Sequence, residues 1–368
     1  MKEGWEYKKF EDALEKVKYT KKLQTNEFLS EGRVPIISQE EEYISGFWNN
    51  PEDAFKVEKP IVIFGDHSRV IKYVDFDFVL GADGVKILRP IESLNAKFLY
   101  HYLKWYNVPS MGYSRHFKFL KEINMPIPPM NVQQQIVSEL DLLSGVIEKQ
   151  KAQLEELDKL AQSIFYEMFG DPVANEKGWE MKKLGEECED MKYGTSRPAC
   201  ENGRYKYLRM GNITLDGHLD LADLKTIDIP EEEVEKCIVR YGDILFNRTN
   251  SHELIGKTCM FDLDEPMIIA GYIIRVRLSE NLKPIFISIM FNLPSMKKLL
   301  RSIAKGAVNQ ANINSKELAS INIIIPPLSL QQEFAAKVEA IEAMKAKVRQ
   351  SLKEVETLFA SRMDYYFN

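Results

Sequence analysis

Six short polar segments carry side chains whose chemistry suits the edges of nucleic-acid bases. Three lie in the first half of the chain and three in the second: GDHSR (65–69), GADGVK (81–86), MGYSRHFK (111–118), RMGN (209–212), FNRTNSH (246–252) and KGAVNQANIN (305–314). Arginine and lysine donate to guanine, asparagine and glutamine pair with adenine, and hydroxyl groups and backbone amides hold phosphates. One such segment is usually a solvated turn, so the recurrence of the pattern is what matters.

The sequence gives weaker signals for catalysis than for base contact. The segment SHELIGKT (251–258) has Ser251 where a phosphate-binding loop needs glycine, and TCMFDL follows it as a strand and turn rather than as a helix. Asp66, His67 and Asp83 could form a nuclease or hydrolase site, but Gly-Asp turns at strand ends explain them as well. No Asn-Pro-Pro-Tyr/Phe motif of an amino-methyltransferase is present. We therefore predict no catalytic residues and no cofactor.

Composition narrows the class of protein. The chain has 368 residues and a net charge of −6, so it should bind DNA only weakly on its own. Four cysteines without a CxxC pair favour reduced thiols in a cytoplasm, and the scattered histidines predict no metal site. The charged start of the chain does not resemble a signal peptide, and no apolar run is long enough to span a membrane.

Two repeated strings reveal the elements that must position the six segments. IPPMNVQQQI (127–136) returns as IPPLSLQQEF (325–334), and GWEYKKFEDALEKVKY (4–19) returns as GWEMKKLGEECEDMKY (178–193). The chain is thus two copies of one unit whose ends match and whose middles differ. The prolines should end each domain, and Asn131 or Ser329 could cap the helix that follows.

Apolar residues at alternating spacings of four and three follow each Pro-Pro pair, which predicts two long helices that pack on each other. The seam residues are Ile136, Leu140, Leu143, Ile147, Leu154 and Leu157 in the first helix, and Val338, Ile341, Val348, Leu352, Val355 and Phe359 in the second. Gln150, Lys345 and Arg362 interrupt the seam. They either fix its register, face partner subunits or are simply exposed.

The segments between the GWE string and the IPP string differ between the two repeats and are predicted to be mixed α/β. The strands are expected at 59–65, 70–81, 85–90, 205–213, 242–249, 256–263 and 268–278, and the helices at 96–106 and 284–304. The six polar segments lie mostly between these elements, so a repeated scaffold carries divergent loops.

The GWE string, the IPP-x₃-QQ hinge, the long helix after it and the two-fold repeat together resemble the specificity subunit of a type I restriction–modification enzyme. GDILFNRTNS with IGKT, NQANIN, FGDHS and GADGVK resemble segments of that family's target-recognition domains. The resemblance implies an α+β fold, with two mixed α/β target-recognition domains separated by two long antiparallel coiled-coil helices in a pseudo-two-fold repeat. The implied domains are 1–130 and 171–328, and the implied spacer helices are 131–170 and 329–368.

The same resemblance implies a non-catalytic protein that reads a bipartite site in double-stranded DNA, with one domain for each half-site. The implied partners are modification (methyltransferase) subunits, two in number, and ATP-dependent restriction subunits. The candidate DNA-contacting residues are His67, Arg69, Lys86, Arg115 and His116 in the first domain, and Arg209, Asn212, Asn247, Arg248, Thr249, Asn309, Gln310 and Asn312 in the second. Two alternatives remain open: the recognition region of a stand-alone DNA-modifying enzyme, and a coiled-coil adaptor with no role in DNA binding.

Overall fold

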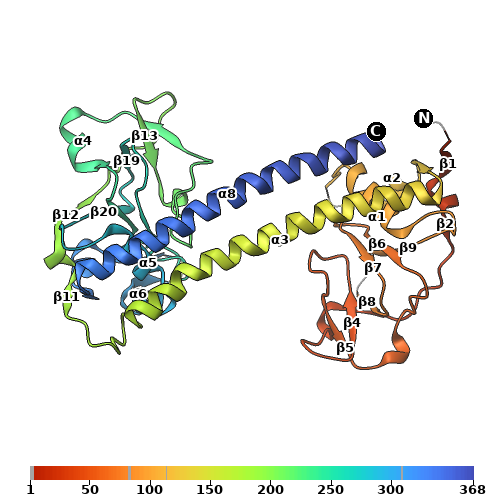
Figure 1. Ribbon diagram of the computed structural model, residues 1–368, viewed down its shortest axis with the longest axis horizontal. Coiled ribbons are helices and arrows are strands. Elements are labelled where there is room, and N and C mark those ends of the chain that lie inside the picture. The colour runs from red at the N-terminus through yellow and green to blue at the C-terminus, as the bar shows by residue number, and fades with distance from the viewer. Residues whose placement is uncertain (1–3, 82–83, 113, 308–309) are drawn as a thin grey trace. The chain divides into compact units, whose positions relative to one another are not determined.

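The computed structural model describes residues 4–81, 84–112, 114–307 and 310–368. The chain forms two compact units: unit 1 comprises residues 1–151 and 350–368, and unit 2 comprises residues 152–349. Two long helices, α3 (Met130–Phe169) and α8 (Leu328–Phe367), each contribute to both units. Each unit is β-rich, and the predicted α+β class and paired long helices are confirmed (Figure 1).

Unit 1 contains two four-stranded sheets. The strand orders are β2 (Leu14–Glu15), β9 (Val85–Pro90), β6 (Ile61–Gly65), β7 (Ile71–Val74) in one sheet, and β3 (Lys22–Leu23), β8 (Val79–Gly81), β4 (Val34–Ile37), β5 (Gly46–Trp48) in the other. The helices α1 (Ala96–Tyr106) and α2 (Phe117–Leu120) follow β9 in the chain. Phe98 of α1 packs in one core with Met363 and Phe367 of α8.

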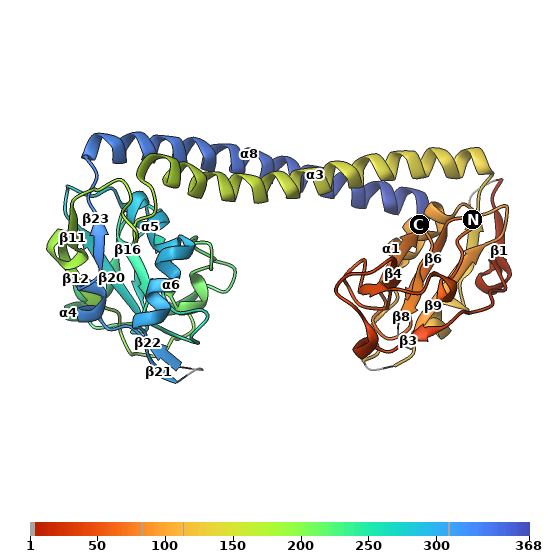
Figure 2. The same ribbon diagram turned by 90° about the horizontal axis from the view of Figure 1, so that it is seen from below.

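Unit 2 repeats this plan and adds to it. Its two four-stranded sheets have the orders β12 (Cys188–Tyr193), β20 (Ile273–Leu278), β16 (Ile244–Asn247), β18 (Thr258–Met260), and β14 (Lys225–Ile227), β13 (Tyr205–Leu208), β19 (Met267–Ile269), β15 (Ile238–Val239). A third sheet has the order β17 (Thr249–Asn250), β22 (Gln310–Asn312), β21 (Lys305–Ala307). The helices are α4 (Glu231–Cys237), α5 (Pro284–Asn292), α6 (Pro294–Ile303) and α7 (Ser315–Ala319). Figure 2 shows β21 and β22 at the end of unit 2 that is opposite α3 and α8.

The two repeated strings close each unit by pairing with each other. In unit 1, β1 (Glu6–Lys9) pairs antiparallel with β10 (Asn124–Ile127). In unit 2, β11 (Met181–Lys183) pairs in the same way with β23 (Asn322–Ile324). The segment after GWE therefore lies beside the segment before Pro-Pro in both units, so the two ends of each repeat meet in one small sheet.

The first glutamine of each Gln-Gln pair is fully buried and bonds three backbone groups. Gln133 accepts from the N–H of Asn95 (2.7 Å) and donates to the carbonyls of Ser93 and Pro128 (both 2.7 Å). Its repeat partner Gln331 has the equivalent acceptor and donor bonds in unit 2, with Lys283 N–H (3.0 Å), Asn281 O (3.2 Å) and Pro326 O (2.9 Å). Each glutamine thus ties the start of a long helix to the start of α1 or α5. We name these two residues the glutamine clamps.

The long helices run antiparallel within each unit (Figures 1 and 2). In unit 1, Gln150 donates to Ser351 (2.7 Å), and Glu139 accepts from Arg362 (2.9 Å) further towards the start of α3. In unit 2, Lys345 is buried and pairs with Asp158 (2.6 Å) and Glu342 (2.8 Å). The three polar seam residues therefore form specific side-chain bonds rather than being simply exposed. Every predicted apolar seam residue is buried or half-buried.

Several local predictions were wrong at their boundaries. Both long helices begin before Asn131 and Ser329, so these residues lie inside the helices and cannot cap them. The stretch 284–304 is two helices, because Pro294 starts α6 and cannot continue α5. The stretch 268–278 is divided at Ala270–Tyr272 into β19 and β20, which belong to different sheets.

Candidate nucleic-acid interface

Arg248 follows β16 in unit 2 and has few internal partners. Its guanidinium carbon lies 4.8 Å from the ring centre of Tyr193, a distance typical of a cation–π contact. Its terminal nitrogens reach Gly271 O (3.5 Å) and the amide oxygen of Asn312 (3.4 Å), both at the long limit for a hydrogen bond. The Tyr193 ring therefore orients the Arg248 guanidinium without occupying its hydrogen-bond donors.

The neighbouring candidates join Arg248 through the third sheet of unit 2. Asn312 pairs with Thr249 between β22 and β17, and its side-chain amide donates to the Thr249 hydroxyl (3.0 Å). Gln310 is exposed on β22. Asn247 is fully buried; its amide oxygen accepts from Thr249 N–H (3.3 Å), and its amide nitrogen has no partner among the described residues. Asn309 lies outside the described residues.

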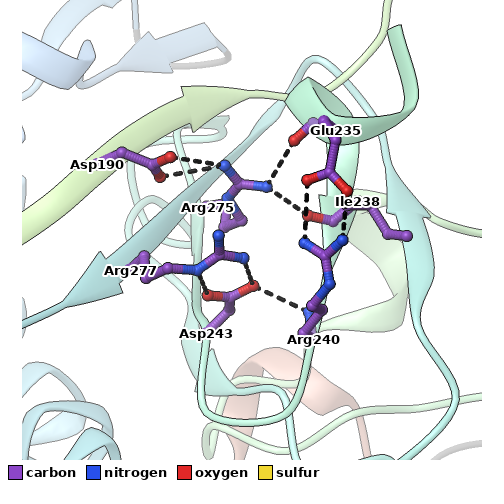
Figure 3. A network of polar contacts seen from close by, with 7 residues as sticks. All are labelled: Asp190, Glu235, Ile238, Arg240, Asp243, Arg275 and Arg277. Atoms are coloured by element: carbon purple, nitrogen blue, oxygen red, sulfur yellow. Dashed lines mark hydrogen bonds and ion pairs between the residues drawn. The ribbon is translucent and has the colours of Figure 1, made fainter. Parts of the chain in front are cut away.

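Most other arginines of residues 171–328 are neutralised by carboxylates. These pairs are Arg197–Glu233, Arg204–Glu231, Arg209–Asp223, Arg240–Glu235, Arg275–Asp190 and Arg277–Asp243. Figure 3 shows three of them in one network, in which the buried Arg275 also donates to the carbonyls of Glu235 and Ile238. Within the described residues of this segment, Arg248 and Arg301 are the arginines without an ion-paired carboxylate. Arg248 therefore combines an uncompensated charge with an aromatic support.

Arg209 and Asn212 occupy a separate loop. The Arg209 guanidinium bonds both the carbonyl (3.0 Å) and the carboxylate (2.7 Å) of Asp223. Asn212 is buried, accepts from Arg209 N–H (2.9 Å) and donates to Asp220 O (2.8 Å). In this conformation both side chains hold the loop in shape.

In unit 1, His116 and Lys86 converge on the buried Asp66. The Asp66 carboxylate accepts from Phe117 N–H (2.8 Å) and lies 3.8 Å from the Lys86 ammonium. His116 is buried, with Nδ1 donating to Asp66 O (3.0 Å) and Nε2 accepting from Met111 N–H (3.3 Å). Both ring nitrogens of His116 are thus used inside the protein.

The remaining unit 1 candidates differ in accessibility. Arg69 has a positive φ of 65° and donates to Val108 O (2.9 Å), and His67 is half-buried with its N–H bonded to Gln39 (3.2 Å). Arg115 is exposed on the loop before α2. Arg115 is therefore the candidate of unit 1 whose guanidinium lies most open to a ligand.

Sequence reasoning missed Tyr193, which lies beside Arg248, and two lysines of unit 2, Lys257 and Lys297. Lys257 donates to Met210 O (2.8 Å), and Lys297 donates to Gly256 O (2.8 Å). Tyr193 lies at the end of the repeated GWE string, and its place in that string indicated a role in the repeated scaffold. Lys257 lies in SHELIGKT, whose IGKT string resembles a target-recognition segment, but the sequence does not mark this lysine among the other residues of that string.

Other parts of the molecule offer less to a nucleic acid. A cleft of about 730 Å³ in unit 2 is lined by α3, α5 and α8, and its polar residues include Asp158, His218 and Lys345. Within the described ranges, no cluster of three or more His, Cys, Asp or Glu side chains could hold a metal ion, and no helix is long and apolar enough to cross a membrane.

Comparison with known proteins identifies the family. The family model for the type I restriction modification DNA specificity domain matches residues 2–159 and again residues 176–357. The EcoKI specificity subunit of Escherichia coli strain K12 is 25% identical over 75% of this chain, and the chain spans only 65% of that relative's length. A putative type I specificity subunit of Haemophilus influenzae is 22% identical over 98% of this chain and 94% of its own length.

Solved structures agree in fold. The crystal structure of a type I restriction–modification S subunit from M. genitalium aligns with a TM-score of 0.60 at 15% identity, covering 98% of this chain and 95% of that one. A chain from a study of complex assembly in the type I restriction–modification system aligns with a TM-score of 0.58 at 18% identity, covering 100% and 98%. With two matches of the family model in tandem, this chain belongs to the family of type I restriction–modification DNA specificity subunits.

Proposed function

We propose that this chain is the non-catalytic DNA-recognition subunit of a type I restriction–modification complex, with each unit reading one half of a bipartite site. The observation that carries the proposal is Arg248, held over Tyr193 without a carboxylate partner among the described residues. A guanidinium in this state can form two parallel hydrogen bonds to a guanine edge in the major groove. Asn312 and Gln310 are proposed to contact neighbouring bases.

In unit 1 we propose Arg115 as the leading base contact, with Arg69, His67 and Lys86 beside it. The buried side chains of His116, Asn212 and Asn247 are proposed to fix loop geometry, since their polar groups face the protein interior. The paired helices α3 and α8 are proposed to bind two modification subunits, which supply the methyltransferase activity, and restriction subunits join them for cleavage. The EcoKI relative's name supports this assignment at the level of the complex.

Exchange of one reading domain tests the proposal. Residues 181–322 are replaced by the equivalent segment of another family member, so that the new segment joins the frame at β11 and β23. Sequencing methylated bases in host DNA should reveal one changed half-site and one unchanged half-site. If both half-sites change, or if the methylated sequence stays the same, the two-reader model is wrong.

A further inference from the structure

Three cations surround the loop that follows Arg248 in unit 2. The loop runs from Ser251 to Lys257 between β17 and β18. Lys297 and Arg301 lie one turn apart on α6 and donate to the loop carbonyls of Gly256 (2.8 Å) and Glu253 (3.2 Å). Lys257 donates to Met210 O (2.8 Å). All three bonds end on neutral carbonyl oxygens, so the positive charges are not cancelled.

These charges are held at an energetic cost. Burial, together with the nearby charges of Arg301 and Lys257, lowers the pKa of Lys297 to about 8. Burial also lowers the pKa of Lys257, against a small opposing effect of Cys259. Within the part of the chain that the structure describes, no carboxylate forms an ion pair with any of the three. An arrangement that concentrates uncompensated charge is expected where an anion binds.

The loop that carries the cluster pairs through its backbone with the residue before Arg248. Asn247 N–H donates to Lys257 O (2.8 Å), and Gly256 N–H donates to Asn247 O (3.2 Å). The backbone of Lys257 therefore lies opposite Asn247, the residue before Arg248. The major groove is about 12 Å wide, and phosphates border it on both sides. A side chain that enters the groove therefore brings its neighbours on the same loop towards the phosphates.

We propose that Lys257, Lys297 and Arg301 form a binding site for the phosphodiester backbone of duplex DNA. The proposal rests on the assignment of unit 2 as a DNA reader and adds a sequence-independent contact to it. The half-buried Lys297 ammonium uses one of its three donors internally, which leaves the others for phosphate oxygens, whereas Lys257 is only 9% exposed and contributes mainly its charge. A bound phosphate would also supply the counter-charge that the protein does not provide here.

The test measures binding of the full-length chain to a duplex of mixed sequence by fluorescence anisotropy. The salt concentration is varied between about 50 and 200 mM at about pH 7, where Lys297 is charged. Lys297→Gln and Arg301→Gln should each reduce the slope of log affinity against log salt by about 0.9, and the double variant by about twice that amount. Lys297→Arg should retain the wild-type slope. The matched control is Lys298→Gln, an exposed residue of the same helix, which should leave the slope unchanged.

Loss of folding is checked by circular dichroism and thermal melting. Arg301 is exposed, so Arg301→Gln gives the same test if Lys297→Gln is unstable. An unchanged slope in a folded double variant would overturn the phosphate site, even if Arg248→Ala still alters sequence preference. If the wild-type chain binds no duplex at low salt, the reader assignment itself fails, and this site fails with it. Millimolar pyrophosphate should compete no better than salt of equal ionic strength; stronger, Lys297-dependent competition would indicate a small-anion site instead.

Discussion

Units 1 and 2 place opposite charges at one position of the same frame. Gly65 pairs with Val85 in unit 1 as Asn247 pairs with Ile273 in unit 2. The next residue is Asp66 in unit 1 and Arg248 in unit 2. Asp66 N–H donates to Gly84 O and its carbonyl accepts from His116 N–H, whereas Arg248 N–H donates to Tyr272 O and its carbonyl accepts from Ile313 N–H.

The side chains at this shared position have different uses. The Asp66 carboxylate is buried and holds α2 and Lys86. The Arg248 guanidinium lies over Tyr193, with only neutral acceptors near it. The backbone bonds at this position are therefore common to both units, whereas the side chain is bonded inside the protein in unit 1 and presents a donor group in unit 2.

The glutamine clamps test whether the frames are equivalent, and they carry the largest expected effect. Gln133→Leu and Gln331→Leu each leave three backbone groups without their partner, one of them in a buried bond and two in part-buried bonds, so each should lower the free energy of unfolding by about 3 kcal/mol. Thermal melting checks the loss. The exposed neighbours provide controls, and Gln134→Leu and Gln332→Leu should be nearly silent. A large loss in only one unit would show that the frames are not equivalent.

The helix seam should tolerate a charge equally poorly in both units. Leu352→Asp in unit 1 and Leu154→Asp in unit 2 place an unpaired carboxylate in a half-buried seam, at a cost of about 2–3 kcal/mol. Both variants should also weaken binding of modification subunits, measured by co-purification. Leu142→Asp is the control, because Leu142 is 68% exposed on the same helix. Wild-type stability with an unchanged complex in both seam variants would contradict the coiled-coil model.

Arg248→Ala should separate the two readers. Loss of a bidentate base contact costs about 1–3 kcal/mol of discrimination, so one position of one half-site should become degenerate. Arg115→Ala should affect the other half-site. Arg204→Ala is the control, because Arg204 is exposed but paired with Glu231. Sequencing of methylated sites gives the readout, and relaxation of both half-sites by Arg248→Ala would contradict the comparison.

A decrease in pH should lower the stability of the two units to different extents, and this is the smallest of the expected effects. His101 of unit 1 is buried, and burial lowers its pKa below the ordinary value of 6.5, although Asp141 at 2.9 Å opposes this shift. The unfolded chain then binds more protons, so the stability of unit 1 should fall as pH decreases below about 6.5. Hydrogen exchange of each unit measures the loss. His101→Phe should reduce the dependence, and an equal acid response in that variant would assign the effect to other groups.

The repeated scaffold could be predicted from the sequence because its signals lie in continuous stretches or occur twice. The heptads of α3 and α8 lie in continuous stretches, and two matched strings marked the ends of each unit. The bonds of the glutamine clamps were not predictable, since Gln133 reaches Asn95 and Gln331 reaches Lys283, far along the chain. The correspondence of Asp66 and Arg248 was hidden for a similar reason. It depends on strand register in middles that share no recognisable string.

Burial also limited the prediction of site residues. His116 and Asn247 have side chains suited to base contact, but the structure places both in the interior. Residue type alone does not distinguish a polar group that faces a ligand from one that satisfies a loop. Tyr193 and Lys297 escaped notice because one lies in a repeated string and the other on a helix.

The position of Met363 and Phe367 in the core of unit 1 has a consequence for synthesis on the ribosome. Both side chains pack with Phe98, although residues 152–349 separate them from the rest of that core. Unit 2 is continuous in the chain and can complete its core first, which reverses the usual order of folding from the N-terminus. We expect chains truncated after residue 349 to protect unit 2 from protease while unit 1 remains sensitive. Equal protection of both units in such chains would exclude this order.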